Sequence, residues 1–249
     1  MQRYFVSGNQ FSDSSVTIQG EDVHHITRVM RMTDGAEIIC CNDHGEAALC
    51  KIAKTTNDYV EANIVKWLED SPELPISITI ASGLPKGDKL ELIVQKGTEL
   101  GAAEFIPFQA KRSITKWDDK KSTKKIDRLQ KIAKEAAEQS HRNAIPHVYE
   151  PHTLRDLINI SKNYDYTLVA FEESAKQNDI STLSQTLIAM NKQQKLLVVF
   201  GPEGGLDETE INLLTENGFL CCGLGPRILR TETAPLYVLA AASYQFEMR

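Results

Sequence analysis

A short loop in the C-terminal half combines residue types that could hold a flat ligand. The run GPEGG, at positions 201–205, follows the apolar segment Leu196–Phe200. Its three glycines leave the backbone bare, its proline stiffens the turn, and Glu203 supplies a carboxylate. A tight turn with a helix cap explains the loop equally well when it is taken alone. The loop matches neither the phosphate-binding pattern G-x-x-x-x-G-K-S/T nor the dinucleotide pattern G-x-G-x-x-G, so kinase and dehydrogenase functions lose their main support.

A second loop, LGPRILRTETA at positions 224–234, adds charge close to the C-terminus. It holds Arg227, Arg230 and Glu232 beside two threonines. One interpretation is structural: Thr231 caps the last helix, Glu232 and Pro235 favour its first turn, and the arginines are solvated. That interpretation does not explain why apolar side chains lie between the arginines in a loop that should face water. A binding function for this loop therefore stays open.

Strands alternate with helices along the chain after residue 72. The segments Thr167–Phe171 and Leu196–Phe200 are apolar at consecutive positions, which is typical of parallel strands covered on both faces. We therefore predict an α/β fold with a parallel sheet between layers of helices. Ligands bind outside the carboxyl ends of the strands in such sheets, and both loops follow predicted strands. The predicted strands are 76–81, 105–108, 167–171, 196–200 and 219–224, and the predicted helices are 86–100, 122–140, 180–190, 207–217 and 232–246.

Residues 1–72 have a different pattern, of short strands with a single helix. Pro72 and Pro75 disfavour regular structure between the two parts, and we predict domains at 1–72 and 73–249. Short strands avoid exposed edges by closure, so the first part suggests a small, closed or nearly closed β-barrel that serves as a binding module. Its predicted strands are 3–6, 16–19, 36–41, 47–53 and 59–67, and its helix is about 22–30.

Charge is distributed unevenly along the chain. The 28 Lys and Arg residues against 34 Asp and Glu residues give a net charge of -6 and a pI of about 5.6, which taken alone speaks against a nucleic-acid partner. However, residues 1–72 hold 6 basic and 11 acidic side chains, whereas residues 110–142 hold 11 basic and 5 acidic ones. The basic segment therefore keeps RNA binding open.

Several other classes of protein are disfavoured. The five cysteines include two adjacent pairs, which favours buried reduced thiols and a cytosolic protein over a disulfide framework. The first residues lack an apolar signal core, and no run of about 18 apolar residues could span a bilayer. The adjacent pair His24 and His25 lacks the spacing of metal ligands, and no metal site is predicted.

The motifs together resemble a known family. GPEGG and LGPRILRTETA, preceded by QKGTELG at 95–101 and EAAEQSHR at 135–142, closely resemble the bacterial 16S ribosomal RNA uridine-N3 methyltransferases of the RsmE family, over nearly the whole chain. The resemblance implies a SPOUT-type α/β domain with a trefoil knot and an N-terminal PUA-like β-barrel that binds RNA. It also implies a cytoplasmic homodimer that uses S-adenosyl-L-methionine.

The resemblance implies an adenosine pocket formed by the two loops and the loop after Phe171. The residues expected to bind the cofactor are Phe171, Gly201, Glu203, Gly204, Leu224, Gly225, Ile228 and Leu229. Methylation of uracil N3 requires its proton to leave and the resulting imide anion to be stabilised. Arg230 is the first candidate for the anion, because a guanidinium stays protonated and offers a rigid fork to a carbonyl oxygen. Glu232 or Glu203 could accept the proton, although Glu232 could instead cap the last helix.

RNA contacts are expected mainly from basic residues. In the helix predicted near 121–140, apolar residues share one face and basic residues lie opposite, as on an ordinary solvated face, but the local surplus of charge favours RNA phosphates. Candidates in this region are Arg112, Lys121, Lys124, Arg128 and Arg142. In the N-terminal part the candidates are Arg3, Arg28 and Arg31, although Arg31 could equally pair with Asp34.

The last predicted helix is apolar almost all round, so it must be buried on more than one side. A core helix and a two-fold subunit interface both explain this pattern, and the resemblance favours a homodimer through the knot and this helix. Two rival functions remain: a non-catalytic RNA-binding ribosome-assembly factor, and a related methyltransferase acting on transfer RNA or on a ribose 2'-hydroxyl.

Overall fold

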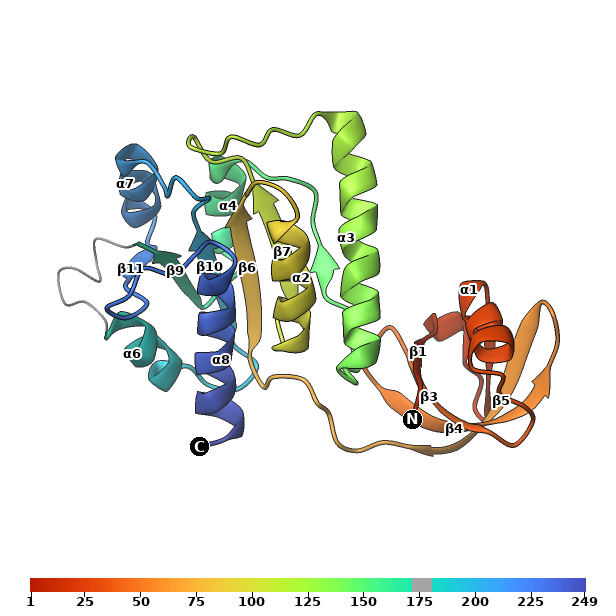
Figure 1. Ribbon diagram of the computed structural model, residues 1–249. Coiled ribbons are helices and arrows are strands. Elements are labelled where there is room, and N and C mark those ends of the chain that lie inside the picture. Colours follow the sequence, from red (N-terminus) through yellow and green to blue (C-terminus); the bar gives the residue numbers. More distant parts are fainter. Residues whose placement is uncertain (172–180) are drawn as a thin grey trace. The chain divides into compact units, whose positions relative to one another are not determined.

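The protein divides into two compact units. The structure, a computed structural model, describes residues 1–171 and 181–249, without the side chains of residues 119–121 (Figure 1). One unit comprises residues 1–73 and 137–145, and the other comprises residues 74–136 and 146–249. The segment 137–145 therefore packs with the N-terminal unit, an arrangement that the predicted contiguous boundary at residue 72 does not include.

The N-terminal unit is built on a five-stranded sheet in the order β1-β3-β4-β5-β2. Neighbouring strands are antiparallel except for β1 and β3, which are parallel. Among the described strands, β1 and β2 are the two edges and do not pair with each other, so strand pairing does not close the sheet into a complete barrel. The strands are β1 (Arg3–Phe5), β2 (Ser15–Gln19), β3 (Glu37–Cys41), β4 (Ala47–Thr55) and β5 (Tyr59–Trp67).

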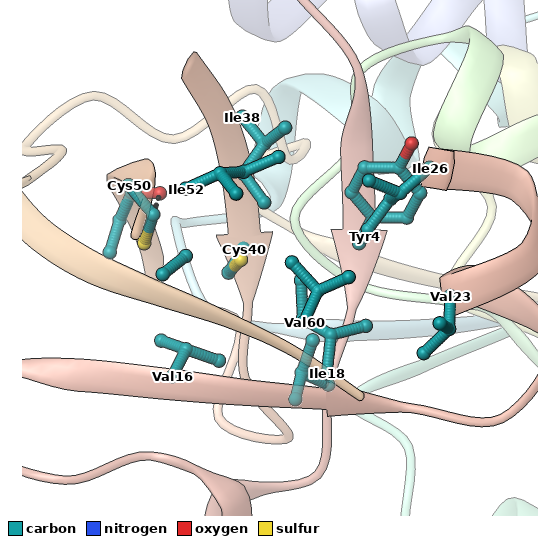
Figure 2. Close-up of a cluster of buried hydrophobic side chains, with 13 residues drawn as sticks. Tyr4, Val16, Ile18, Val23, Ile26, Ile38, Cys40, Cys50, Ile52 and Val60 are labelled. Atoms are coloured by element: carbon teal, nitrogen blue, oxygen red, sulfur yellow. Dashed lines mark hydrogen bonds between the residues drawn. The ribbon is translucent and has the colours of Figure 1, made fainter. Parts of the chain in front are cut away.

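The core of this unit follows from alternation along the strands. Alternate residues such as Val16 and Ile18, or Ile38 and Cys40, point to one face and are buried there (Figure 2). Tyr4 joins them from β1. The predicted helix at 22–30 is instead α1 (Glu21–His24) followed by one π-helical turn, η2 (His25–Val29), and a short 3₁₀ turn, η1 (Gly8–Gln10), follows β1.

The C-terminal unit contains the predicted parallel sheet, in the order β11-β9-β10-β6-β7-β8. Sequence patterns missed the short strand β8 and helix α4. The strands are β6 (Ser77–Gly83), β7 (Glu104–Phe108), β8 (His147–Val148), β9 (Tyr166–Ala170), β10 (Lys195–Phe200) and β11 (Leu220–Cys222). The helices are α2 (Lys89–Glu99), α3 (Asp119–Gln139), α4 (Leu154–Ser161), α6 (Thr182–Ala189), α7 (Glu208–Glu216) and α8 (Thr233–Glu247).

Helices cover both faces of this sheet, which explains the consecutive apolar residues of its strands. Leu197 and Val199 of β10 face a cluster that contains Leu157 of α4 and Leu214 of α7. On the other face α2 and α8 lie side by side (Figure 1). Gly97 lets α2 pack closely on the sheet, because an added Cβ would lie 2.7 Å from the Phe105 ring of β7, and Leu239 of α8 would lie 3.6 Å from the same position.

The cysteines and the helices bear on the predicted class of protein. None of the five cysteines forms a disulfide within the described residues, and four of them are buried. In the part of the chain that the structure describes, no helix is both long and apolar enough to cross a membrane. The trefoil knot stays a prediction.

Candidate active site

One cavity of about 460 Å³ opens at the carboxyl ends of β9, β10 and β11. The loops 201–206 and 224–231 form most of its wall. The structure brings the eight predicted cofactor residues together around it: Phe171, Gly201, Glu203, Gly204, Leu224, Gly225, Ile228 and Leu229. Much of the predicted loop after Phe171 (172–180) lies outside the described residues.

The glycines of the first loop are required by close backbone packing. A Cβ on Gly201 would lie 2.9 Å from the carbonyl carbon of Gly205, and a Cβ on Gly204 would lie 3.1 Å from Cβ of Arg112. The end of β6 approaches the same loop, since a Cβ on Gly83 would lie 2.6 Å from Cδ of Pro202. An ordinary turn at the surface would not need this packing, so the loop is a built wall of the cavity.

Glu203 is held by groups from the start of α2. Its Oε1 lies 2.7 Å from Nζ of Lys89 and accepts the backbone N–H of Lys86 at 3.1 Å. Nζ of Lys89 also lies 3.7 Å from Oε2 of Glu232. One ammonium group therefore lies between the two carboxylates that the sequence proposed as proton acceptors.

These contacts set the charge of Glu203. Partial burial would raise its pKa, but the hydrogen bonds from Lys89, from backbone N–H groups and from Lys86 outweigh burial, and the pKa of Glu203 lies below its ordinary value. Glu203 is therefore ionised at neutral pH. A carboxylate with a lowered pKa is a weaker proton acceptor than one with an ordinary pKa.

Neither Thr231 nor Glu232 caps α8, so the capping interpretation was wrong. The helix begins at Thr233, and the residue before it, Glu232, makes no side-chain cap hydrogen bond. The N–H groups of Thr233 and Ala234 donate instead to the backbone oxygen of Arg230, at 2.8 and 3.0 Å. Oε2 of Glu232 is buried and accepts no hydrogen bond within the described residues.

Arg230 lies outside the wall of the cavity, and its side chain is exposed. The pKa of Lys89 is raised, chiefly by its hydrogen bond to Glu203, and the positive charge of Arg230 acts in the opposite direction. Arg112, which was predicted to contact RNA, instead lines the cavity. One of its guanidinium nitrogens donates to the backbone oxygen of Gly204 at 3.1 Å, and another lies 3.9 Å from a carboxylate oxygen of Asp207.

Comparisons with known proteins agree with this arrangement. Residues 72–243 match a family model described as an RNA methyltransferase domain, and residues 18–65 match one described as an RNA methyltransferase PUA domain. Ribosomal RNA small subunit methyltransferase E of Bacillus subtilis (strain 168) is 53% identical over 251 residues, which cover 100% of this chain and 98% of that protein. The chain belongs to the ribosomal RNA small subunit methyltransferase E family.

Solved structures of similar chains share the fold. A crystal structure of a hypothetical protein has a TM-score of 0.91 and 51% identity, and the match covers 99% of each chain. The methyltransferase E of Neisseria gonorrhoeae, crystallised with S-adenosyl methionine, has a TM-score of 0.83 and 29% identity, over 99% of this chain and 98% of that one.

Two residues predicted to bind RNA have structural roles in this member of the family. Arg3 and Arg142 are only 8% and 5% exposed. Arg3 donates to the backbone oxygen of Arg142 at 3.0 Å and to the side-chain oxygen of Asn143. Arg142 forms a buried ion pair with Glu73, with Nε 3.0 Å from Oε2. Both side chains are buried and bonded to internal partners, which makes them less suited to contact RNA than the exposed basic residues.

The other basic candidates are exposed where the structure describes them. Arg28 and Arg31 lie at the surface of the N-terminal unit, and Arg31 forms no ion pair with Asp34 among the described contacts. Lys124 is exposed on α3. Arg128 is exposed too, but both of its partners are oxygens of Glu91, at 2.8 Å each. The side chain of Lys121 lies outside the described residues. The RNA-binding role of these exposed residues stays a prediction.

Lys89 is the main residue of the site that sequence reasoning missed. It is 114 positions from Glu203 along the chain and belongs to no motif around the loops. A lysine in the first turn of a helix is unfavourable for the helix dipole. This unfavourable position was the only feature of the sequence by which Lys89 could have been suspected of a role other than stabilising the helix.

Proposed function

We propose that this protein transfers a methyl group from S-adenosyl-L-methionine to N3 of a uridine in the 16S ribosomal RNA of the small subunit. The observation that carries the proposal is the meeting of all eight implied cofactor residues around one cavity. Membership of the methyltransferase E family supports the RNA substrate. The S-adenosyl methionine bound by the Neisseria relative supports the cofactor.

The residues of the cavity fit this cofactor. Its volume lies within the range of roughly 300–1,000 Å³ that is common for small-molecule sites. Ile228 lines the cavity, and its apolar side chain is 78% exposed. A bound cofactor would cover this side chain. Gly201 and Gly204 line the cavity without side chains, which would let backbone N–H and C=O groups reach the edge of an adenine ring. When bound, the cofactor supplies an electrophilic methyl group.

The chain's own residues would prepare the uracil for that methyl group. A carboxylate must accept the N3 proton, and Glu203 and Glu232 are the candidates beside the cavity. The imide anion spreads its charge over two carbonyl oxygens, which a cation can stabilise. Arg230 is exposed, belongs to the loop that lines the cavity and has no carboxylate partner among the described residues, so it suits this role. A guanidinium stays charged throughout the reaction.

Substrate RNA would bind through a few exposed basic residues and not through an overall positive charge of the protein. The net charge of -6 opposes nonspecific binding, and the exposed cations Arg28, Arg31, Lys124 and Arg128 would select an orientation. The exposed ring of Tyr244 and the half-exposed Tyr237 leave an aromatic face on α8. A homodimer through this helix would bury that face. The reaction would take place in the cytoplasm, where ribosomal subunits are present.

The experiment that tests the proposal uses 30S subunits from cells that lack the modification. The purified protein should transfer label from methyl-labelled S-adenosyl-L-methionine to their 16S RNA. No transfer, together with no saturable cofactor binding in calorimetry, would leave a non-catalytic RNA-binding protein. Label on transfer RNA or on a ribose 2'-hydroxyl would overturn the proposed substrate. Analytical ultracentrifugation tests the homodimer, which a monomer at micromolar concentration would contradict.

A further inference from the structure

The first turn of α2 supplies a cation that touches the two carboxylates unequally. We propose that Lys89 is a positioning residue: it holds Glu203 in the wall of the cofactor cavity and thereby leaves Glu232 to accept the proton of the substrate. This inference rests on the proposed function. It resolves which of the two candidate carboxylates acts as the base.

The distances favour this division. Nζ of Lys89 is within hydrogen-bond distance of Glu203, at 2.7 Å, but lies 3.7 Å from Glu232, beyond a hydrogen bond. The same oxygen of Glu203 accepts the N–H of Lys86. Proton uptake by Glu203 would weaken both contacts. The loop 201–205, which these contacts hold in place, would then be free to move. Glu203 is therefore suited to a structural charge and not to a base that changes its protonation in each cycle.

Glu232 has the complementary environment. Its side chain is 16% exposed, and Oε2 is buried with no hydrogen-bond donor within the described part of the chain. A buried carboxylate oxygen without a donor is costly and is uncommon in native proteins. The imide N–H of uracil is a donor of the required kind. The unoccupied acceptor therefore points to the substrate proton.

The neighbouring charges are consistent with this assignment. Lys89 comes from α2, Glu203 from the loop after β10, and Arg230 and Glu232 from the loop before α8; Lys86 takes part only through its backbone. Two cations and two carboxylates nearly neutralise each other. When environments separate two carboxylates in this way, the more weakly solvated and less paired one takes the proton-transfer role.

The N3–H bond breaks and its proton goes to Oε2 of Glu232, while the electron pair remains on N3. That pair forms the N3–methyl bond, and the methyl–sulfur bond breaks with its electrons left on sulfur, which becomes a neutral thioether. Arg230 stabilises the anion between the two events and exchanges no proton. The protonated Glu232 then returns its proton to solvent.

The first test measures Glu203 directly in the unliganded protein. Carboxyl carbon NMR over a pH titration should show a higher pKa of Glu203 in Lys89→Met, and Lys89→Arg should restore the wild-type value. Lys96→Met is the matched control, because Lys96 lies on the same helix and forms an ion pair of the same length, 2.7 Å, with Glu99. Equal titration of Glu203 in wild type and Lys89→Met would overturn the positioning role.

The second test separates the two carboxylates by kinetics on 30S subunits. Glu232→Gln should lower kcat by at least about 100-fold with the cofactor Kd nearly unchanged, because a general base contributes roughly 10²–10⁴-fold. Glu203→Gln should mainly raise the cofactor Kd. The reversed pattern would make Glu203 the base and overturn the inference. Failure of the proposed function itself would look different: the wild type would bind no cofactor and transfer no methyl group, while the NMR comparison would still report on Lys89.

Discussion

The packing of β6 against the cofactor loop can be tested with a single methyl group. In Gly83→Ala the new Cβ would lie 2.6 Å from Cδ and 2.8 Å from the backbone nitrogen of Pro202. An ordinary contact begins near 3.4 Å, so Cδ must retreat by roughly 0.8 Å, the difference between 3.4 and 2.6 Å. The backbone nitrogen is nearly as close, at 2.8 Å, and a change of ring pucker therefore cannot relieve the clash. The loop 201–205 has to move.

This movement should cost cofactor binding more than folding. Overpacking by a methyl group costs about 1–3 kcal/mol. If the loop 201–205 moves away in the free protein, most of this free energy is lost only when the cofactor binds, because binding requires the original loop position. We expect the Kd for S-adenosyl-L-methionine to rise by roughly 5- to 150-fold, which corresponds to that energy. Because a misplacement of about 1 Å can lower a rate by about 10²-fold, kcat should fall as well.

Isothermal titration calorimetry measures the Kd, and circular dichroism checks the fold. Gly8→Ala is the control, because its new Cβ would meet no atom closer than 3.4 Å. A Kd for Gly83→Ala within twofold of wild type, with the fold intact, would refute the reasoning that this contact fixes the loop.

Three further predictions address the remaining residues. Arg230→Ala should lower kcat/KM by about 10²–10³-fold with the cofactor Kd kept; equal losses in both would make Arg230 a cofactor residue. Arg142→Ala should destabilise the N-terminal unit by about 3 kcal/mol, because the partly buried Glu73 loses its partner. Hydrogen exchange of the β1 and β3 amides measures this, and exchange as slow as in the exposed-site control Arg28→Ala would contradict it. Neutralising three basic residues of α3 together, Lys121, Lys124 and Arg128, should reduce the slope of log affinity against log salt by about 2 for single-stranded RNA. An unchanged slope would mean that these residues only face solvent and do not contact RNA phosphates.

The parallel sheet and the cavity were predictable because their signals are local. Consecutive apolar residues such as Leu196–Phe200 report burial on both faces, and a strand that precedes a glycine loop places that loop at the carboxyl edge. The family resemblance then placed eight residues that meet at one cavity. The short elements α4 and β8 were missed because so few residues carry little periodicity.

The roles of single charged residues were harder to predict. Arg3 and Arg142 read as exposed cations, yet they are buried, because Glu73 and Asn143 supply partners from distant positions. Lys89 meets Glu203 across 114 residues. Glu232 was expected to favour the helix terminus, but the backbone oxygen of Arg230 accepts the first N–H groups instead. Such pairings depend on the fold as a whole, and no pattern of neighbouring residues encodes them.

The most direct test of the central claim is nucleoside mass spectrometry of 16S RNA. Subunits from cells lacking the modification are incubated with the protein and methyl-labelled S-adenosyl-L-methionine, and their RNA is digested to nucleosides. The account predicts a single labelled product, 3-methyluridine, at close to one per subunit, and an initial rate at least about 100-fold lower with Glu232→Gln. Unlabelled RNA, or label on any other nucleoside, would contradict it.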